Sequence, residues 1–115
     1  MSLNKFLFTG NLTRDAEIAS TTGDRARAHI RIAVNDAWTD EQGQRHERAN
    51  FFNITVWGSD AENAAKYLGK GSLIFVEGRV ASTEWEKDGE KRYGTDFVAT
   101  HIQYVDTKKP GSDNA

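Results

Sequence analysis

The stretch that decides the fold is residues 50–58, with the sequence NFFNITVWG. Its residues alternate between two kinds, as the side chains of a β-strand alternate between the two faces of a sheet. Phe52, Ile54 and Val56 are uniformly apolar and suit a protein core. The other set mixes polar and aromatic side chains, which a core does not favour. Its members are Phe51, Asn53, Thr55 and Trp57. This parity predicts that the second set faces outward.

Similar patterns on either side predict further strands. Residues 27–35 alternate most clearly, with Ile30 and Ile32 on one face and His29 and Arg31 on the other. Residues 40–44 form a polar, glycine-containing connection to the strand at 50–58. The Asp88-Gly89 pair predicts the turn of a long hairpin. The predicted strands lie at 5–11, 27–35, 50–58 and 72–80, and in a hairpin from 81 to about 104.

One short helix is predicted between the third and fourth strands. Apolar residues at helical spacing, from Ala61 to Leu68, form one small stripe. Ser59 with Glu62 three residues later is the pattern of a capping box, which predicts the start of the helix. Gly69 is predicted to follow the helix with a positive φ.

The order strand, strand, strand, helix, strand, strand predicts an all-β protein with one short helix. It matches the OB-fold, a five-stranded Greek-key β-barrel. A two-layer sheet with the helix on one face is the alternative. Without repeats or a second domain in its 115 residues, the chain is predicted to form one domain at 1–106. Residues 107–115, which include the only proline, are expected to be a short disordered tail.

Composition restricts the function. Fifteen Lys and Arg against 17 Asp and Glu give a net charge of −2, which argues against a nucleic-acid binder that works mainly through phosphates. Binding by base stacking remains compatible with that charge. The absence of cysteine excludes disulfides and thiolate metal sites. Residues 1–12 are too polar for a signal peptide and no run reaches membrane-spanning length, so a cytoplasmic protein is expected.

Four aromatic residues are the leading candidates for a binding site. Phe51, Trp57 and Trp85 have the parity of the outward faces of their strands, and Trp38 lies beside a loop. Any one of them has burial in a core or an interface as its alternative. Together they predict a stacking surface for bases of any sequence. Arg31 and Arg79 lie on outward faces and are predicted to contact phosphates.

The order and spacing of several segments are specific in combination. They are residues 4–12, 30–34 leading to Trp38, 51–58, 64–72, 76–80, Trp85 and Arg92-Tyr93. In these segments the chain resembles the bacterial single-stranded-DNA-binding protein (SSB) family. The resemblance implies an OB-fold homotetramer that binds single-stranded DNA without sequence preference in replication, recombination and repair. It also implies a cytoplasmic location at the nucleoid.

The resemblance assigns roles to individual residues. Base-stacking positions of the family fall on Trp38, Phe51, Trp57 and Trp85, and phosphate-contacting positions fall on Lys5, Lys70 and Arg92. Asn53, Ser59 and Glu84 stand where relatives often carry a basic residue, which implies fewer phosphate contacts and a weaker salt dependence. Residues 108–115 lack the acidic, phenylalanine-terminated tip of many relatives, so nothing here supports protein partners recruited by the tail.

Two other classes of protein compete with this interpretation. An enzyme is disfavoured because His29, His46 and His101 are scattered without metal-ligand spacing, and neither a metal nor a cofactor is expected. The second is an adaptor similar to the small OB-fold primosomal protein of replication restart, which oligomeric state would distinguish. Apolar Leu73 and Phe75 on the face opposite the core favour an oligomer.

Overall fold

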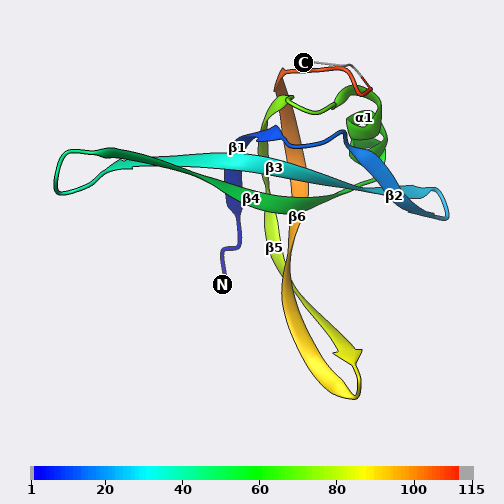
Figure 1. Ribbon diagram of the computed structural model, residues 1–115. Coiled ribbons are helices and arrows are strands. Elements are labelled where there is room, and N and C mark those ends of the chain that lie inside the picture. The colour runs from blue at the N-terminus through cyan, green and yellow to red at the C-terminus, as the bar shows by residue number, and fades with distance from the viewer. Residues whose placement is uncertain (1, 112–115) are drawn as a thin grey trace.

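The computed structural model describes residues 2–111, which form six strands and one helix. The elements are β1 (Phe6–Leu12), β2 (Glu17–Thr22), β3 (Arg25–Thr39), β4 (Arg45–Trp57), α1 (Ser59–Tyr67), β5 (Leu73–Lys87) and β6 (Glu90–Asp106). Figure 1 shows a small barrel from which the β3–β4 and β5–β6 hairpins project in different directions, with α1 at one end. These two hairpins are the longest features of the molecule.

Five strands close into a barrel in the order β1-β5-β6-β4-β3, and β3 returns to β1. The closing contact is short and antiparallel, with Asn11 opposite Ala33 and Leu12 opposite Ile32. The pairing of β4 with β6 is parallel, and all the others are antiparallel. This arrangement, with the helix between the third and fourth barrel strands, confirms the predicted OB-fold.

The barrel interior is filled by the predicted core faces. The residues less than 2 % exposed include Ile30, Ile32, Ile54 and Val56, as their parity predicts. Four phenylalanines pack beside them, and the rings of Phe8 and Phe52 stack with centroids 4.4 Å apart. Among residues 2–111, the buried apolar residues are Phe6, Leu12, Ala16, Ala26, Ala28, Ile30, Ile32, Ile54, Val56, Ala61, Ala64, Leu68, Ile74, Val76 and Val98.

Gly78 lies where the backbone of β6 leaves no space for a side chain on β5. A Cβ atom at this position would collide with the carbonyl oxygen of Val98 and lie 2.7 Å from the ring of Phe6. The register between β5 and β6 also shifts at this point, between Glu77 and Gly78. The bulge and the missing side chain together let the sheet bend tightly enough to close.

Strand β2 is the element that the sequence pattern missed. It pairs only with β3, outside the closed barrel, and its six residues are mostly exposed. Ile18 is its only large apolar residue, and that side chain is 42 % exposed. Because β2 buries no alternating apolar face, its sequence carries no period-2 signal.

The predicted N-cap of α1 is wrong, and the prediction for its C-terminal end is right in position only, because Gly69 follows the C-cap but does not have a positive φ. The N-cap is Gly58, whose φ of 69° is favoured only by glycine, and no side chain caps the helix. Ser59 is therefore already inside the first turn. The helix ends with Leu68 as an extended C-cap. Gly69 is needed for space, because a Cβ atom there would lie 2.6 Å from the carbonyl oxygen of Lys109.

Residues 107–111, the first part of the expected disordered tail, fold back onto the barrel. The Gly69 amide donates to the Lys108 carbonyl at 2.7 Å, and the Lys108 amide donates to Ser72 Oγ at 2.8 Å. The Gly111 amide donates to Asp15 Oδ2 at 2.9 Å. These bonds join the segment to the loops at the end of the barrel. The rest of the expected tail, 112–115, lies outside the described residues.

Candidate nucleic-acid interface

The outer face of the β3–β4 ribbon carries Phe51 and Trp57. The register places Phe51 opposite Ala33 and Trp57 opposite Arg27, on the side away from Ile30 and Ile54. Phe51 is 51 % exposed and Trp57 is half-buried. Two flat rings thus lie on the same strand and the same face, six residues apart.

Arginine side chains lie over both rings. The guanidinium of Arg31 is 4.3 Å from the centroid of Phe51, and those of Arg25 and Arg27 are 4.9 Å and 5.7 Å from that of Trp57. The Nε atom of Arg27 is buried without a hydrogen-bond partner among residues 2–111. Arg31 is among the residues predicted from the sequence, whereas Arg25 and Arg27 are not. The continued alternation of arginines at 25, 27 and 31 was the signal that could have found them.

Thr55 corrects one part of the parity prediction. It has outward parity but is only 4 % exposed, because β6 crosses β4 here in a parallel pairing of Thr55 with Val98. Its hydroxyl donates to Asp96 Oδ1 at 2.8 Å. The outer face is therefore interrupted between Asn53 and Trp57.

Trp38 lies near the tip of the β3–β4 ribbon, on the side opposite Phe51. It is paired with His46, and its parity on β3 is that of Ile32 rather than that of Ala33. Because the ribbon here extends beyond the barrel, Trp38 is 47 % exposed in spite of that parity. The four predicted stacking residues therefore do not share one continuous face.

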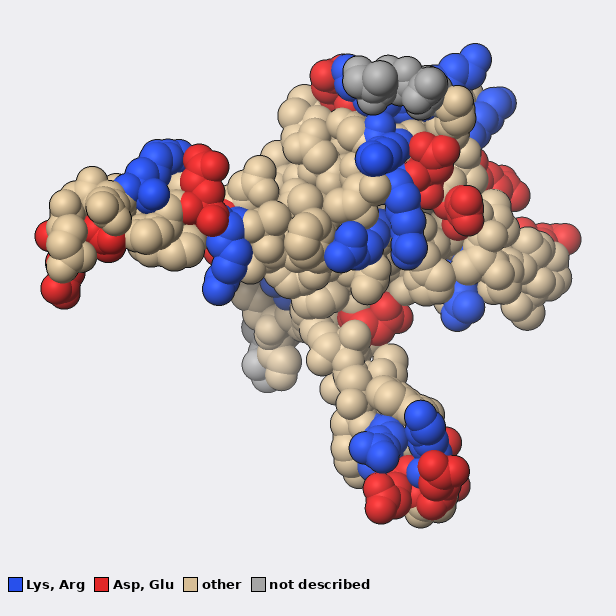
Figure 2. Space-filling model, in the orientation of Figure 1, with Lys and Arg blue, Asp and Glu red and all other residues tan. Residues whose placement is uncertain are grey.

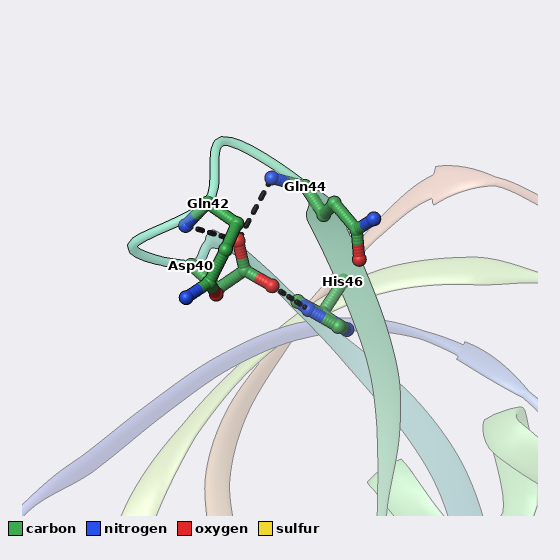
Figure 3. A network of polar contacts seen from close by, with 4 residues as sticks. All are labelled: Asp40, Gln42, Gln44 and His46. Atoms are coloured by element: carbon green, nitrogen blue, oxygen red, sulfur yellow. Dashed lines mark hydrogen bonds and ion pairs between the residues drawn. The ribbon is translucent and has the colours of Figure 1, made fainter.

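The turn beside Trp38 is organised by one carboxylate (Figure 3). Asp40 Oδ1 accepts hydrogen bonds from the amides of Gln42 and Gln44, at 2.9 Å and 2.8 Å. Asp40 Oδ2 lies 2.7 Å from Nε2 of His46, whose ring stacks on Trp38. The hydrogen bond from His46, followed by that from Gln44, lowers the pKa of the Asp40 carboxyl.

Trp85 lies on the second hairpin, formed by β5 and β6. The register of β5 runs without a shift from Gly78 to Lys87, so Trp85 keeps the outward parity of Arg79. The ring is 48 % exposed and lies over Gly94, where a Cβ atom would be only 3.0 Å from a ring carbon. Arg92 is the residue directly opposite on β6.

The predicted phosphate-contacting cations are only partly gathered around these rings. Arg31 contacts Phe51 and Arg92 neighbours Trp85, but Arg92 is 3.5 Å from Glu90. Lys5 is paired with Glu77 at 3.0 Å. Lys70 and Arg79 are exposed, and within residues 2–111 neither makes a cation–π contact with the four aromatic rings. Figure 2 shows cations near the middle of the barrel, and both charge signs along the β3–β4 ribbon and at the tip of the β5–β6 hairpin.

Other kinds of site find little support. Within residues 2–111, no group of three or more His, Cys, Asp and Glu side chains could hold a metal ion. None of the helices in that part of the chain has the length and apolar character to cross a membrane. The remaining features are a β-barrel with exposed aromatic rings and arginines on protruding ribbons, which define a nucleic-acid-binding OB-fold protein.

Comparisons with known proteins narrow this class. The model of the Single-strand binding protein family matches residues 3–105, so the chain belongs to that family. Its members are not enzymes, which confirms the expectation of a non-catalytic protein. A single-stranded DNA-binding protein of Neisseria meningitidis is 37 % identical over 100 % of this chain and 67 % of its own length. One from Staphylococcus aureus is 42 % identical over 92 % of this chain and 67 % of its own.

Solved structures agree on the fold. The single-stranded DNA binding protein from Thermus aquaticus, as a deletion mutant, has a TM-score of 0.80 at 38 % identity. The match covers 90 % of this chain and 51 % of that one, so the present chain spans about half of that protein. A Plasmodium falciparum SSB in complex with ssDNA also has a TM-score of 0.80, at 22 % identity, over 92 % of this chain and 97 % of that one.

Proposed function

We propose that this protein binds single-stranded DNA without sequence preference and protects it during replication, recombination and repair. The observation that carries the proposal is the pair of rings on the outer face of β4, Phe51 and Trp57, each with arginine over it. Every base has a π-face, so a stacking site accepts all sequences, at about 1–3 kcal/mol per base.

The arginines supply the second half of the interaction. A cation over an exposed aromatic ring contributes only about 0.5–1 kcal/mol. A charge-assisted hydrogen bond to a phosphate is stronger, and the planar guanidinium suits that geometry. We therefore expect Arg25, Arg27 and Arg31 to exchange their rings for phosphates when DNA arrives, leaving Phe51 and Trp57 open to bases. Family membership and the names of the relatives support the same ligand.

The other predicted contacts complete the proposed path. Trp38 and Trp85 would stack further bases at the two ribbons, each being about half exposed. Lys5, Lys70, Arg79 and Arg92 would contact phosphates. Lys5 and Arg92 must first give up Glu77 and Glu90, and exposed pairs of this kind contribute about 0–1 kcal/mol. In a bacterium, such a protein would act in the cytoplasm at the nucleoid.

A homotetramer is part of the proposal. Leu7 is 56 % exposed on the outside of β1, and Leu73 and Phe75 lie on the same side of the neighbouring strand β5. Exposed apolar side chains on adjacent strands favour contact with another subunit. Light scattering at micromolar concentration tests this point, and a monomer would refute it.

Fluorescence titration with oligo(dT) tests the DNA-binding proposal. Stacking on Trp38, Trp57 and Trp85 should quench tryptophan emission strongly, with saturation at a fixed ratio of nucleotides to protein. Unchanged emission at low salt, together with no shift of a labelled oligo(dT) in a gel, would refute single-stranded DNA binding.

A further inference from the structure

His46 covers one side of the Trp38 indole. The two ring centroids are 5.5 Å apart and the ring planes differ by 20°, which is a stacked arrangement. The residues are directly opposite each other on β3 and β4, so the stack spans the two strands of the ribbon. Trp38 is still 47 % exposed, which leaves its other side open to solvent.

The imidazole of His46 is itself held in place by the carboxylate of Asp40. Its Nε2 atom lies 2.7 Å from Asp40 Oδ2, and the other oxygen of Asp40 accepts two amide hydrogens of the turn, from Gln42 and Gln44 (Figure 3). The position of the imidazole is thus fixed by the backbone of the turn. A side chain near the tip of a projecting hairpin would otherwise lose more conformational entropy when it binds a ligand.

We propose that His46 is a positioning residue, which holds Trp38 in the orientation in which its open side stacks on a base of single-stranded DNA. This inference rests on the proposed function. His46 acts through Trp38 and does not itself contact the DNA. Asp40 acts on Trp38 indirectly, because it holds His46 in position. An indole that is already held in its binding orientation loses less conformational entropy when it binds DNA. Removing His46 therefore weakens the complex even though the indole remains.

A double-mutant cycle tests the inference, with affinity for oligo(dT) measured by anisotropy of a labelled strand. We expect His46→Ala to weaken binding about two- to tenfold, the range of an aromatic pair. Trp38→Ala should weaken it at least as much. In the Trp38→Ala background, His46→Ala should have no further effect, because the residue that it positions is gone.

Two further variants give the cycle its controls. His46→Phe keeps a ring on Trp38 and should bind within about twofold of the unsubstituted protein. His101→Ala removes an exposed histidine of β6, far along the chain from this hairpin, and should leave the affinity unchanged. A second readout needs no DNA. The side-chain NH signal of Trp38 in ¹⁵N relaxation should show a more mobile indole in His46→Ala and not in His46→Phe.

Each alternative result would overturn the inference. His46→Ala with full affinity would show that Trp38 needs no positioning. Additive losses in the double variant would mean that His46 contacts DNA directly. An unaffected Trp38→Ala variant would remove both Trp38 and His46 from the site, while binding through Phe51 and Trp57 would still support the proposed function. Only the failure of the unsubstituted protein to bind oligo(dT) would refute that function as well.

Discussion

The two hairpins that project from the barrel are of similar length but are built differently. The β3–β4 ribbon carries Phe51, Trp57 and Trp38, each in contact with an arginine or a histidine. The β5–β6 hairpin carries Trp85 above Gly94. Charge pairs occur on both hairpins, as in Arg45 with Glu47 and Lys91 with Glu84. The arginine–ring contacts found among residues 2–111 all lie on β3–β4. We infer that the first ribbon provides most of the binding energy and the second provides an additional contact.

The largest expected loss of affinity comes from Trp57, and it is compared with the loss from Trp85 on the other hairpin. Trp57→Ala should weaken oligo(dT) binding by about 2–3 kcal/mol, because it removes the ring on which a base stacks. Trp85→Ala should cost about 1 kcal/mol, the lower end of the range for a stacked base. Isothermal titration of both variants with the same oligonucleotide decides the order. An equal or reversed order would contradict the assignment of the main site to β3–β4.

A substitution of Gly94, over which the Trp85 ring lies, should have an intermediate effect on the affinity for oligo(dT). Gly94→Val places branched carbons where even a Cβ atom would be 2.9 Å from Thr83 Oγ1 and 3.0 Å from the Trp85 ring. The ring should be displaced, and affinity should fall by no more than in Trp85→Ala. Thr95→Val, at the next position of β6 and on its other face, is the matched control. If Gly94→Val lost more than Trp85→Ala, the hairpin would have a role beyond its tryptophan.

The arginines are expected to set the salt dependence of binding, and losing one should cost the most affinity at low salt. Each phosphate contact contributes about −0.7 to the slope of log K against log salt for single strands. Arg31→Gln should therefore make the slope shallower by about 0.7. Arg45→Gln, which removes a cation already 3.3 Å from Glu47 at the ribbon tip, should leave it unchanged. Titrations at four salt concentrations measure both slopes, and identical slopes would exclude Arg31 from the phosphate path.

The smallest effect is a response to acid that separates the two turns. A carboxyl with a lowered pKa stabilises the fold above its ordinary value near 3.9 and loses this contribution as pH falls through the lowered folded value. Asp40 should thus release the amides of Gln42 and Gln44 below about pH 4. Within residues 2–111 the β5–β6 turn has no such bonds, and its shape comes from positive φ at Asp88 and Gly89. The amides of Gln42 and Gln44 should lose protection from hydrogen exchange as pH falls, whereas the amides of the second turn, which donate to no carboxylate, should not.

Much of this architecture follows from local pattern. Alternation in the strand at 50–58 correctly separates Ile54 and Val56 from Phe51. The parity of Trp85 holds because the bulges near it fall in β6 and leave β5 regular. These features need only the two-residue period of a strand and an apolar interior.

The errors come from non-local contacts. Thr55 is buried by a strand more than forty residues away, a crossing that its neighbours in sequence do not reveal. The stack of His46 on Trp38 depends on the register set by the turn between them, and Arg25 precedes the predicted strand at 27–35. The start of α1 is decided by the backbone of Gly58 and not by the hydroxyl of Ser59. Each of these features depends on tertiary contacts or on backbone conformation, which the alternation of residues along one strand does not show.

We expect stacking, more than charge, to hold the DNA, as the net charge of −2 suggests. Comparing oligo(dT) with an abasic strand of the same length tests it most directly, because the two have the same phosphates and differ only in the bases. Titration calorimetry at moderate salt should show the abasic strand binding at least a hundredfold more weakly, since about 1–3 kcal/mol is lost per stacked base. Equal affinity for the two strands would contradict the claim.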